Sequence, residues 1–365
     1  MLKANAEEAL ARLEDLFSGR GRDRIFVHMQ VKSPALALYA GTHVDGERGY
    51  PDLREREAFW RGLAAESREL RDDSIPTAYM SEFDEGLYTG LMGAEIRYLE
   101  NRETGWVSSM SVPFVERLDD IERLDFDRTG ALAELYSAQL RFYAEESRGN
   151  YGISHFILID GLNALLELRG ATNMYYDCVD EPGKVRRFFD FARTVNYWVQ
   201  DRFFEIIGPF RGGTCSNLGQ WIPGRIVSES LDPFHMASVD FFEQWGRENA
   251  ERVFGRYDGG IIHIHTGNGM HLVRPASTLK GLKMIAFIDE DFNPMKAFHQ
   301  LPQIDADRGD VPVHLSVPMA RFAGMLAERR LVGNALYSVT EVPDVSTANS
   351  LMEKVRMYSP PSVAH

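Results

Sequence analysis

The stretch of sequence that decides the fold is Gly259-Gly-Ile-Ile-His-Ile-His-Thr-Gly-Asn-Gly269. It begins as an apolar run typical of a buried β-strand and ends in a polar, glycine-rich turn. His263 and His265 stand two residues apart, so both imidazoles point to the same face of the strand. Two imidazoles at the exit of a buried strand indicate a functional site in an α/β protein. The alternative is a pair of core histidines whose hydrogen bonds are simply satisfied.

The composition narrows the class of partner and the compartment. The 365 residues include 54 acidic and 40 basic side chains, which give a net charge of −14. This charge argues against nucleic acid and anionic membranes as partners, because both bind basic surfaces. The two cysteines, Cys178 and Cys215, form no CxxC pair and no disulfide framework, which predicts a reducing compartment. The N-terminus reads as an amphipathic helix rather than a signal peptide, and no apolar run reaches about 18 residues, so we expect a cytoplasmic protein.

Most of the chain repeats one pattern, a strand followed by a helix. Strands are predicted at residues 24–30, 74–80, 153–159, 260–265, 282–288, 311–317 and 334–340, and the segment 208–219 is predicted to carry one further, glycine-flanked strand. Such alternation favours a parallel sheet covered by helices. Eight units predict a single (β/α)8 barrel over residues 23–365, preceded by an N-terminal helical extension over residues 1–22. The alternative is an open doubly wound sheet, although no GxGxxG motif follows the first strand.

Other segments carry more local expectations. Helices are expected over residues 5–18 and 128–147, and one continuous helix over residues 232–254. Residues 31–53 contain glycines and a proline at turn positions and are expected to be irregular. Residues 94–112 are expected to form a hairpin inserted into the main architecture.

Polar residues follow the predicted strands at their carboxyl ends, where a barrel keeps its catalytic groups. The candidate catalytic residues are Asp84, Asp160, Glu82 and His263. The candidate substrate-binding residues are His28, Tyr176, Cys215, Asn217, Trp221 and Asn268. Both aspartates have an alternative role as helix N-caps, and Cys215 as a small buried residue. The two aromatic residues serve equally well as packing side chains.

A metal site is one function for the paired histidines. A site needs three or four ligands, of which His263 and His265 supply two. The third would come from Cys215, Glu82, Asp84 or Glu341. The acidic run Asp289–Asp291 is interpreted as a solvated loop, and His314 as a core histidine. A GxSxG elbow and a P-loop are both missing from the sequence, so neither supports a serine hydrolase or a nucleotide site.

Five stretches form an ordered series along the chain. They are Asp84–Gly93, Gly170–Val185, Trp221–Met236, His263–Asn268 and Glu341–Leu351. The first is a strand-ending aspartate followed by a leucine-glycine turn, the third begins W-x-P-G, and the fourth is similar to a zinc motif H-x-C-G-N. In order and spacing the series resembles the uroporphyrinogen decarboxylase superfamily. That superfamily includes decarboxylases and corrinoid- or coenzyme M-linked methyltransferases, and the similarity spans roughly residues 70–357.

Two departures from the family pattern bear on the substrate. The arginine-rich loop with which the decarboxylases hold substrate carboxylates is missing from Val27–Pro34. The histidine that follows their eighth strand is replaced by Thr340-Glu341-Val342. A tetrapyrrole with several carboxylates needs several cations, so uroporphyrinogen is not the expected substrate.

The resemblance implies a group-transfer enzyme, and the preferred expectation is a methyltransferase between a small methylated substrate and a corrinoid, pterin or thiol acceptor. In the zinc motif, His263 matches the histidine, His265 stands at the first cysteine, and Thr340 stands near a late cysteine. The implied metal is zinc, with His263, His265 and Glu341 as ligands, or with Glu82 as the third. The implied partners are a corrinoid protein that carries cobalamin and a second copy of the chain in a homodimer.

Two other functions stay open at this point. One is a decarboxylase or other lyase on a small carboxylic acid, in which Asp84 would stabilise a developing positive charge. The other is a ligand-binding barrel without catalysis.

Overall fold

A computed structural model describes residues 3–155, 157–218 and 220–361 of the chain. Within these residues the main sheet has six strands in the order β1-β13-β12-β11-β10-β9, and every neighbouring pair is parallel. The strands are β1 (Phe26–Val31), β9 (Val227–Ser230), β10 (Gly260–His265), β11 (Leu282–Ile288), β12 (Val313–Pro318) and β13 (Ala335–Val342). The protein is therefore a mixed α/β protein with a mostly parallel sheet, as the alternation of strands and helices predicts.

Two smaller sheets accompany the main one. The first has the order β3-β6-β7-β8, in which β8 is antiparallel. It contains β3 (Thr77–Tyr79), β6 (Gly152–His155), β7 (Gly213–Ser216) and β8 (Gln220–Pro223). The second is antiparallel and contains β2 (Gly46–Arg48), β4 (Ile96–Asn101) and β5 (Trp106–Ser111). The strands β4 and β5 confirm the predicted hairpin, and an isolated parallel bridge joins Leu158 to Glu229 of β9.

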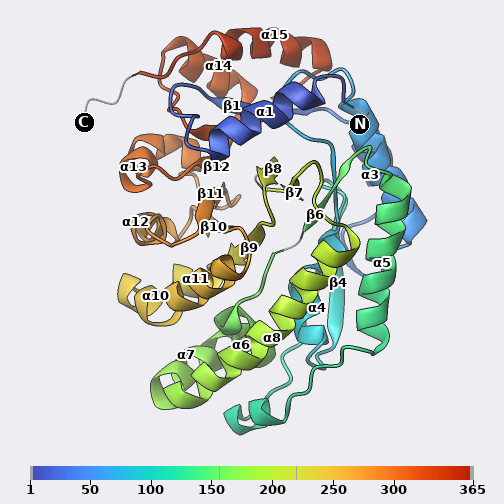
Figure 1. Ribbon diagram of the computed structural model, residues 1–365, viewed down its shortest axis with the longest axis vertical. Helices are drawn as coiled ribbons and strands as arrows, with labels where there is room; N and C mark the ends of the chain where they lie inside the picture. Colours follow the sequence, from blue (N-terminus) through green and yellow to red (C-terminus); the bar gives the residue numbers. More distant parts are fainter. Residues whose placement is uncertain (1–2, 156, 219, 362–365) are drawn as a thin grey trace.

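Helices lie around the outside of the strands (Figure 1). The first half of the chain supplies α1 (Ala6–Phe17), α2 (Pro34–Thr42), α3 (Leu53–Glu66), α4 (Glu85–Gly90), α5 (Ala131–Ser147), α6 (Gly161–Arg169) and α7 (Ala171–Asp180). The second half supplies α8 (Pro182–Ile206), α9 (Asp232–His235), α10 (Val239–Trp245), α11 (Arg247–Arg256), α12 (Val273–Ala276), α13 (Leu301–Asp307), α14 (Met319–Ala327) and α15 (Val345–Arg356). Short 3-10 turns are η1 (Ser81–Phe83), η2 (Leu118–Arg123), η3 (Met270–Leu272) and η4 (Ala297–His299). Among the described residues, no helix combines the length and the apolar composition needed to cross a bilayer.

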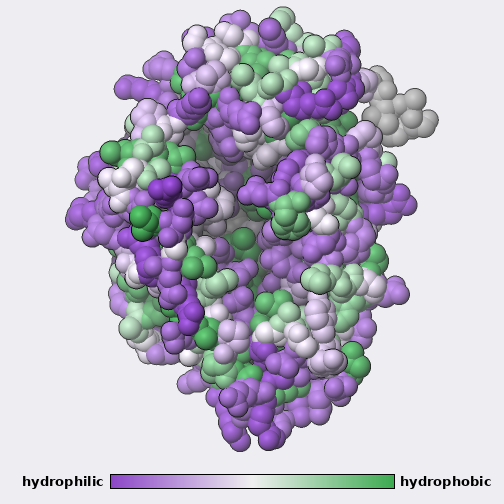
Figure 2. All heavy atoms as spheres, turned by 180° about the vertical axis from the view of Figure 1, so that it is seen from behind, coloured by the Kyte–Doolittle hydropathy of each residue, from purple (hydrophilic) through white to green (hydrophobic). Residues whose placement is uncertain are grey.

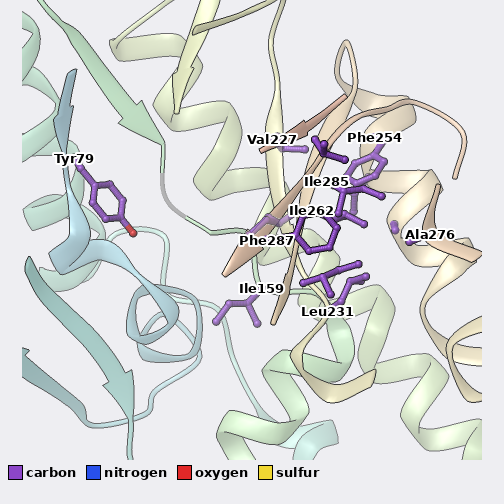
Figure 3. Packing of buried hydrophobic residues seen from close by; sticks show 14 of the residues in the cluster. Tyr79, Ile159, Val227, Leu231, Phe254, Ile262, Ala276, Ile285 and Phe287 are labelled. Atoms are coloured by element: carbon purple, nitrogen blue, oxygen red, sulfur yellow. The ribbon is translucent and has the colours of Figure 1, made fainter. Parts of the chain in front are cut away.

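The two faces of the main sheet differ in character. The face toward the helices is mainly apolar and belongs to the largest core cluster, with Ile262, Ile285 and Phe287 packed near Phe254 of α11 (Figure 3). The opposite face is apolar mainly where the strands begin, at residues such as Ile261 and Met284. Toward the strand ends it carries polar side chains, because alternation along β10 turns His263 and His265 to this face.

Helix α1 covers the apolar end of that second face. Its buried residues Leu13 and Leu16 pack with Phe26, Leu336 and Trp221, which lie at or near the beginnings of strands. Figure 1 shows α1 lying across the sheet near β1. The face of the molecule seen from the other side is hollowed near its centre (Figure 2). The N-terminal helix is thus packed into the core rather than appended to it.

Two adjacent aspartates connect β1 to the segment that leads into β3. Asp73 Oδ2 accepts a hydrogen bond from Val27 N at 2.9 Å, and Asp72 Oδ2 accepts one from Met29 N at 2.6 Å. The backbone N–H of Asp73 donates to Val27 O at 2.8 Å. The buried ammonium of Lys3 forms an ion pair with Asp72, so the N-terminus is tied to the same point. Burial opposes ionisation of Asp72, but the charges of Lys3 and His28 lower its pKa below the usual range.

The second aspartate extends this connection to the last helix. Asp73 Oδ1 lies 2.7 Å from Arg12 Nε of α1 and 2.8 Å from Arg356 Nη1 of α15. The carboxylates of Asp72 and Asp73 therefore join the first helix, the first strand and the last helix. We call these two residues the aspartate clamp.

Two local predictions are wrong. Residues 31–53 are not irregular, because Ser33 caps α2 through its side chain and Pro34 occupies the first turn, where its missing N–H is tolerated. Residues 232–254 are not one helix but α9, α10 and part of α11, and Ser238 provides a fresh N-cap for α10. The glycine-flanked strand predicted in the segment 208–219 is confirmed as β7, which is followed by an antiparallel partner in β8.

Lys3→Met is expected to destabilise the fold by about 3–5 kcal/mol, because it leaves the buried carboxylate of Asp72 without its cation. The exposed Lys280→Met is the matched control and should change stability by less than about 0.5 kcal/mol. Urea denaturation followed by circular dichroism measures both. Equal stability of the two variants would show that the clamp does not hold the N-terminus.

Candidate functional site

Four side chains meet at the carboxyl end of β10. Asp232 and His235 come from α9, and their spacing of three places them on one side of its single turn. His263 and His265 come from β10. His263 Nε2 lies 3.1 Å from Asp232 Oδ1, His265 Nε2 lies 3.5 Å from it, and His235 Nδ1 lies 3.7 Å from it. One carboxylate oxygen is thus surrounded by three imidazoles.

The neighbours of β10 leave room for this cluster. Register pairing sets His263 beside Ala286 of β11 and Ser230 of β9, which are both small. After the strand, Gly269 approaches His235 so closely that a Cβ there would lie 2.7 Å from its ring carbon Cδ2. The glycine-rich turn is therefore required for the position of His235, in addition to ending the strand.

Three of these residues could hold a metal ion. A carboxylate oxygen of Asp232 and one ring nitrogen each of His235 and His265 lie within 4.8 Å of one another. Two imidazoles and a carboxylate are a common catalytic zinc set that leaves a coordination position open. Behind them, Glu290 Oε1 lies 3.4 Å from His265 Nδ1, which is the kind of contact that orients a ligating imidazole.

The protonation of the three groups fits this role, because metal ligands must be deprotonated. Burial lowers the pKa of His235 to about 4 and lowers that of His265 below its usual range. Burial alone would raise the pKa of Asp232, but the hydrogen bond from His263 and the nearby imidazoles lower it overall. His235 Nε2 is buried and, among the described residues, has no hydrogen-bond partner. The donor set therefore suits a divalent cation.

A group of carboxyls adjoins the histidines. It consists of Asp84, Glu85 and Glu167, and Glu167 Oε2 accepts from Ser111 Oγ at 2.9 Å. Burial, together with the charges of Asp232 and Glu167, raises the pKa of Asp84 to about 7 against the opposing effect of His263. Burial and then repulsion from Asp84 and Glu167 raise the pKa of Glu85 to about 9. Asp84 and Glu85 can therefore hold protons near neutral pH and donate them.

Asp160 has the capping role that was the alternative for it. Its side chain accepts a hydrogen bond from Asn163 N at 2.7 Å at the start of α6. Burial nevertheless raises its pKa to about 6, despite these backbone donors. Asp84 also occupies an N-cap position, at α4, but its side chain makes no capping hydrogen bond. Its Oδ1 is buried without a donor among the described residues.

The other predicted residues lie in different surroundings. Glu82 is fully buried, with its Oε2 3.7 Å from Arg56 Nη2, and accepts from Gln139. Cys215 and Trp221 pack beneath α1 at the strand beginnings, and burial raises the pKa of the Cys215 thiol to about 12. His28 Nδ1 lies 3.2 Å from Gln220 Nε2. Their predicted roles stay predictions.

The remaining predicted residues belong to loops or exposed surfaces. Asn217 donates its backbone N–H to Ser154 Oγ, and Asn268 is exposed in the turn after β10. Tyr176 is exposed on α7. Glu341 is exposed on β13 at a positive φ of 60°, and the potential metal group in the described residues does not include it. His314 is buried beside Ser338, with 2.8 Å between Nε2 and Oγ, as expected of a core histidine.

Sequence reasoning missed several members of the site, namely Asp232, His235, Glu85, Glu167 and Glu290. The spacing Asp-x-x-His at residues 232–235 could have indicated two ligands on one side of a helical turn, but it was interpreted only as part of a longer helix. Glu290 belongs to the run interpreted as a solvated loop, yet its Oε2 accepts from Gly267 N at 2.8 Å. Asp232 and His235 become recognisable only when α9 is placed beside β10, and the three glutamates only when α4, α6 and the segment after β11 are placed there too.

Comparison with known proteins does not assign the chain to a family. No model of a protein family matches the sequence, and no curated protein matches it either. The resemblance to the uroporphyrinogen decarboxylase superfamily therefore stays a prediction from the motifs.

Asp84 and Asp160 should retain protons at pH values where an ordinary aspartate has lost them. Folding raises both pKa values above the usual 3.8, to about 7 and about 6, so protonation favours the folded state. This stabilisation is complete below the usual value and is lost as pH rises through 6 to 7. Carbon-13 NMR of aspartate-labelled protein should show two such carboxyl titrations, and Asp84→Asn and Asp160→Asn should each remove one. A protein whose aspartates all finish titrating below about pH 5 would contradict this assignment.

Proposed function

We propose that the protein is a divalent-metal-dependent group-transfer enzyme, with zinc as the metal. The observation that carries the proposal is the set Asp232, His235 and His265, whose ligand atoms lie within 4.8 Å of one another. A zinc ion in such a set supplies Lewis-acid chemistry, by polarising an oxygen or holding a water. The set replaces the combination with Glu341 that the sequence predicted.

The chain's own residues have distinct tasks in this proposal. His263 donates from Nε2 to Asp232 and so fixes that carboxylate, while Glu290 orients His265. Asp84, protonated near neutral pH, acts as the general acid and gives its proton to the leaving group. Glu85 keeps a neighbouring proton and can restore that of Asp84.

The transfer we favour is that of a methyl group from a small donor to a corrinoid, pterin or thiol. A buried acid beside a Lewis-acid site supports release of a poor leaving group, which a methyl donor with nitrogen or oxygen requires. A corrinoid-carrying protein, a homodimer and a cytoplasmic location are part of the proposal. The second candidate is a lyase, because protonated Asp84 could deliver a proton to carbon after loss of carbon dioxide.

We further propose that the strands close into a (β/α)8 barrel. The bridge between Leu158 and Glu229 supports a link from β9 to the chain that continues β6. The aspartate clamp supports a link from β1 to the chain that leads into β3, and β3 pairs with β6. With these two links the six-stranded sheet, β3 and β6 would form a ring of eight strands.

Purified protein is expected to contain about one zinc ion per chain by elemental analysis, as a three-ligand site requires. Asp232→Asn and His265→Ala should each lower zinc affinity by at least about tenfold. His299→Ala, which changes an exposed histidine outside the site, is the control and should keep full metal content. Absence of stoichiometric metal from the unaltered protein would refute the proposal.

Gly269→Ala tests the same site without touching a ligand. The new Cβ would lie 2.9 Å from His235 Nε2, so the imidazole must move and zinc affinity should fall by about tenfold or more. The backbone at Gly269 has φ of −97°, which alanine adopts without strain. Gly255→Ala, where a Cβ meets nothing within 4 Å, is the matched control.

Two assays on the zinc-loaded protein distinguish methyl transfer from the lyase reaction. Mixing with cobalamin and methylated donors should change the absorption of the cobalt centre if methyl transfer occurs. Release of carbon dioxide from small carboxylic acids would support the lyase instead. If the zinc-loaded protein gives neither signal, both proposed reactions are contradicted.

A further inference from the structure

We propose that His28 determines substrate specificity in the same barrel, because it presents a fixed Nε2–H that selects an uncharged oxygen acceptor on the substrate. The inference rests on the proposed function in that the substrate would lie between His28 and the metal set. It is carried by two linked hydrogen bonds whose direction a backbone N–H fixes, and by the small, uncharged side chains on the same face of the sheet.

The hydrogen-bonding role of His28 is set by Gln220. The backbone N–H of Ile75 can only donate, and it lies 3.2 Å from Gln220 Oε1, so that oxygen is the acceptor. The other end of the same amide is therefore the NH2 group, and its Nε2 lies 3.2 Å from His28 Nδ1. An amide NH2 group only donates, so Nδ1 accepts and carries no proton. The proton of the ring is then on Nε2.

Gln220 is held firmly for this task. The residue is only 7% exposed, and its backbone has a φ of 60°, in the left-handed region that residues other than glycine seldom adopt. Such conformations persist where the surrounding structure requires them, and they cluster at functional positions. Burial lowers the pKa of His28 against the charge of Asp72, and the charge of Lys3 lowers it further, so the ring is neutral near pH 7.

The other end of the ring faces the interior of the proposed barrel. Register pairing from β1 through β13, β12 and β11 to β10 puts His28 on the same face of the main sheet as His263. Within the described residues His28 Nε2 has no hydrogen-bond partner, and the residue is only partly buried. In the proposed ring of eight strands, β1 and β10 stand four places apart in both directions. His28 and the metal set would therefore face each other across the barrel.

The surroundings of His28 leave space and add no free charge. Its register partner Ser338 is small, as is Ser316 next to it, and Ser316 is only partly buried. Figure 2 shows the molecule hollowed near its centre. The charges that act on His28 are those of Lys3 and Asp72, which form an ion pair with each other. A ligand group beside Nε2–H therefore meets a neutral donor and no free cation among the described residues.

A single neutral donor selects an uncharged acceptor. One hydrogen bond compensates a carbonyl or ether oxygen for leaving water, whereas a carboxylate needs a cation or several donors. An ammonium or amidinium group would set N–H against N–H. The substrate is therefore expected to carry a carbonyl or ether oxygen at the end that lies away from the metal.

The first measurement is nitrogen-15 NMR at pH 7 of purified protein labelled at histidine. The signals of His28, recognised by their loss in His28→Gln, should be those of a neutral ring with its proton on Nε2. Gln220→Glu should place a proton on Nδ1, because the new carboxylate can still accept from Ile75 N but can no longer donate to the ring. The exposed Gln244→Glu is the matched control and should leave the tautomer unchanged.

The second measurement is NMR titration of protein freed of metal by a chelator. Its three probes share one isopropyl group and have similar shapes: isopropyl methyl ketone, isobutyrate and isobutyramidinium. The ketone should bind at least about fivefold more tightly than either ion, which is the effect of one neutral hydrogen bond. His28→Phe should lower ketone affinity by about fivefold, whereas His28→Gln, which keeps an N–H donor, should retain most of it. The exposed His299→Phe should have no effect.

The outcomes separate this assignment from the metal-dependent function. A proton on Nδ1 of His28 in the unaltered protein, unchanged ketone affinity in His28→Phe, or tighter binding of either ion would overturn the assignment, even if the protein contains stoichiometric zinc. Neither measurement requires bound metal. Absence of zinc together with the expected tautomer and ketone preference would support the role of His28 and contradict the metal-dependent function alone.

Discussion

The aspartate clamp is the constraint on which the rest of the structure depends. Asp72 and Asp73 accept the backbone N–H groups of Val27 and Met29, which a neighbouring strand would otherwise satisfy. Buried carboxylates in that position need cations, and these come from Lys3 ahead of the first helix, from Arg12 within it and from Arg356 of the last helix. The N-terminal segment and the last helix are thereby held against the first strand. The site residues near Asp84 follow directly from the segment that the clamp positions.

The buried carboxyls of the candidate site differ from those of the aspartate clamp in what compensates for their burial. In the clamp, fixed cations keep the carboxylates ionised. Around Asp84 and Glu85 fixed cations are not found among the described residues, and burial raises both pKa values instead. Such carboxyls either keep a proton or take a cation from outside. In the proposed function they keep a proton, and this is the physical origin of the acid role.

The sequence predicted the fold class because periodicity is local, and it located β10 and the hairpin for the same reason. It also found His263, His265 and Asp84, since strand ends can be read from the pattern. It did not find Asp232 and His235, because their value depends on α9 lying against β10, a contact set by distant packing. The prediction of one continuous helix is wrong at residues 236–238, where the chain turns and Ser238 caps the start of α10. Cys215 looked like a strand-end residue, but α1 covers the end of the sheet where it lies.

The position of α1 also has a kinetic consequence. Leu13, Leu16 and Phe26 fill the beginnings of the strands with apolar side chains, while the histidines stand at the opposite ends. In the proposed barrel, small molecules that reach His263 would use the side away from α1 and leave by the same route. The donor and the acceptor of the proposed transfer would share that opening, so they would either bind side by side or take turns. Product that lingers in the opening excludes the next substrate, and turnover then follows the rate of departure rather than the rate of bond breaking.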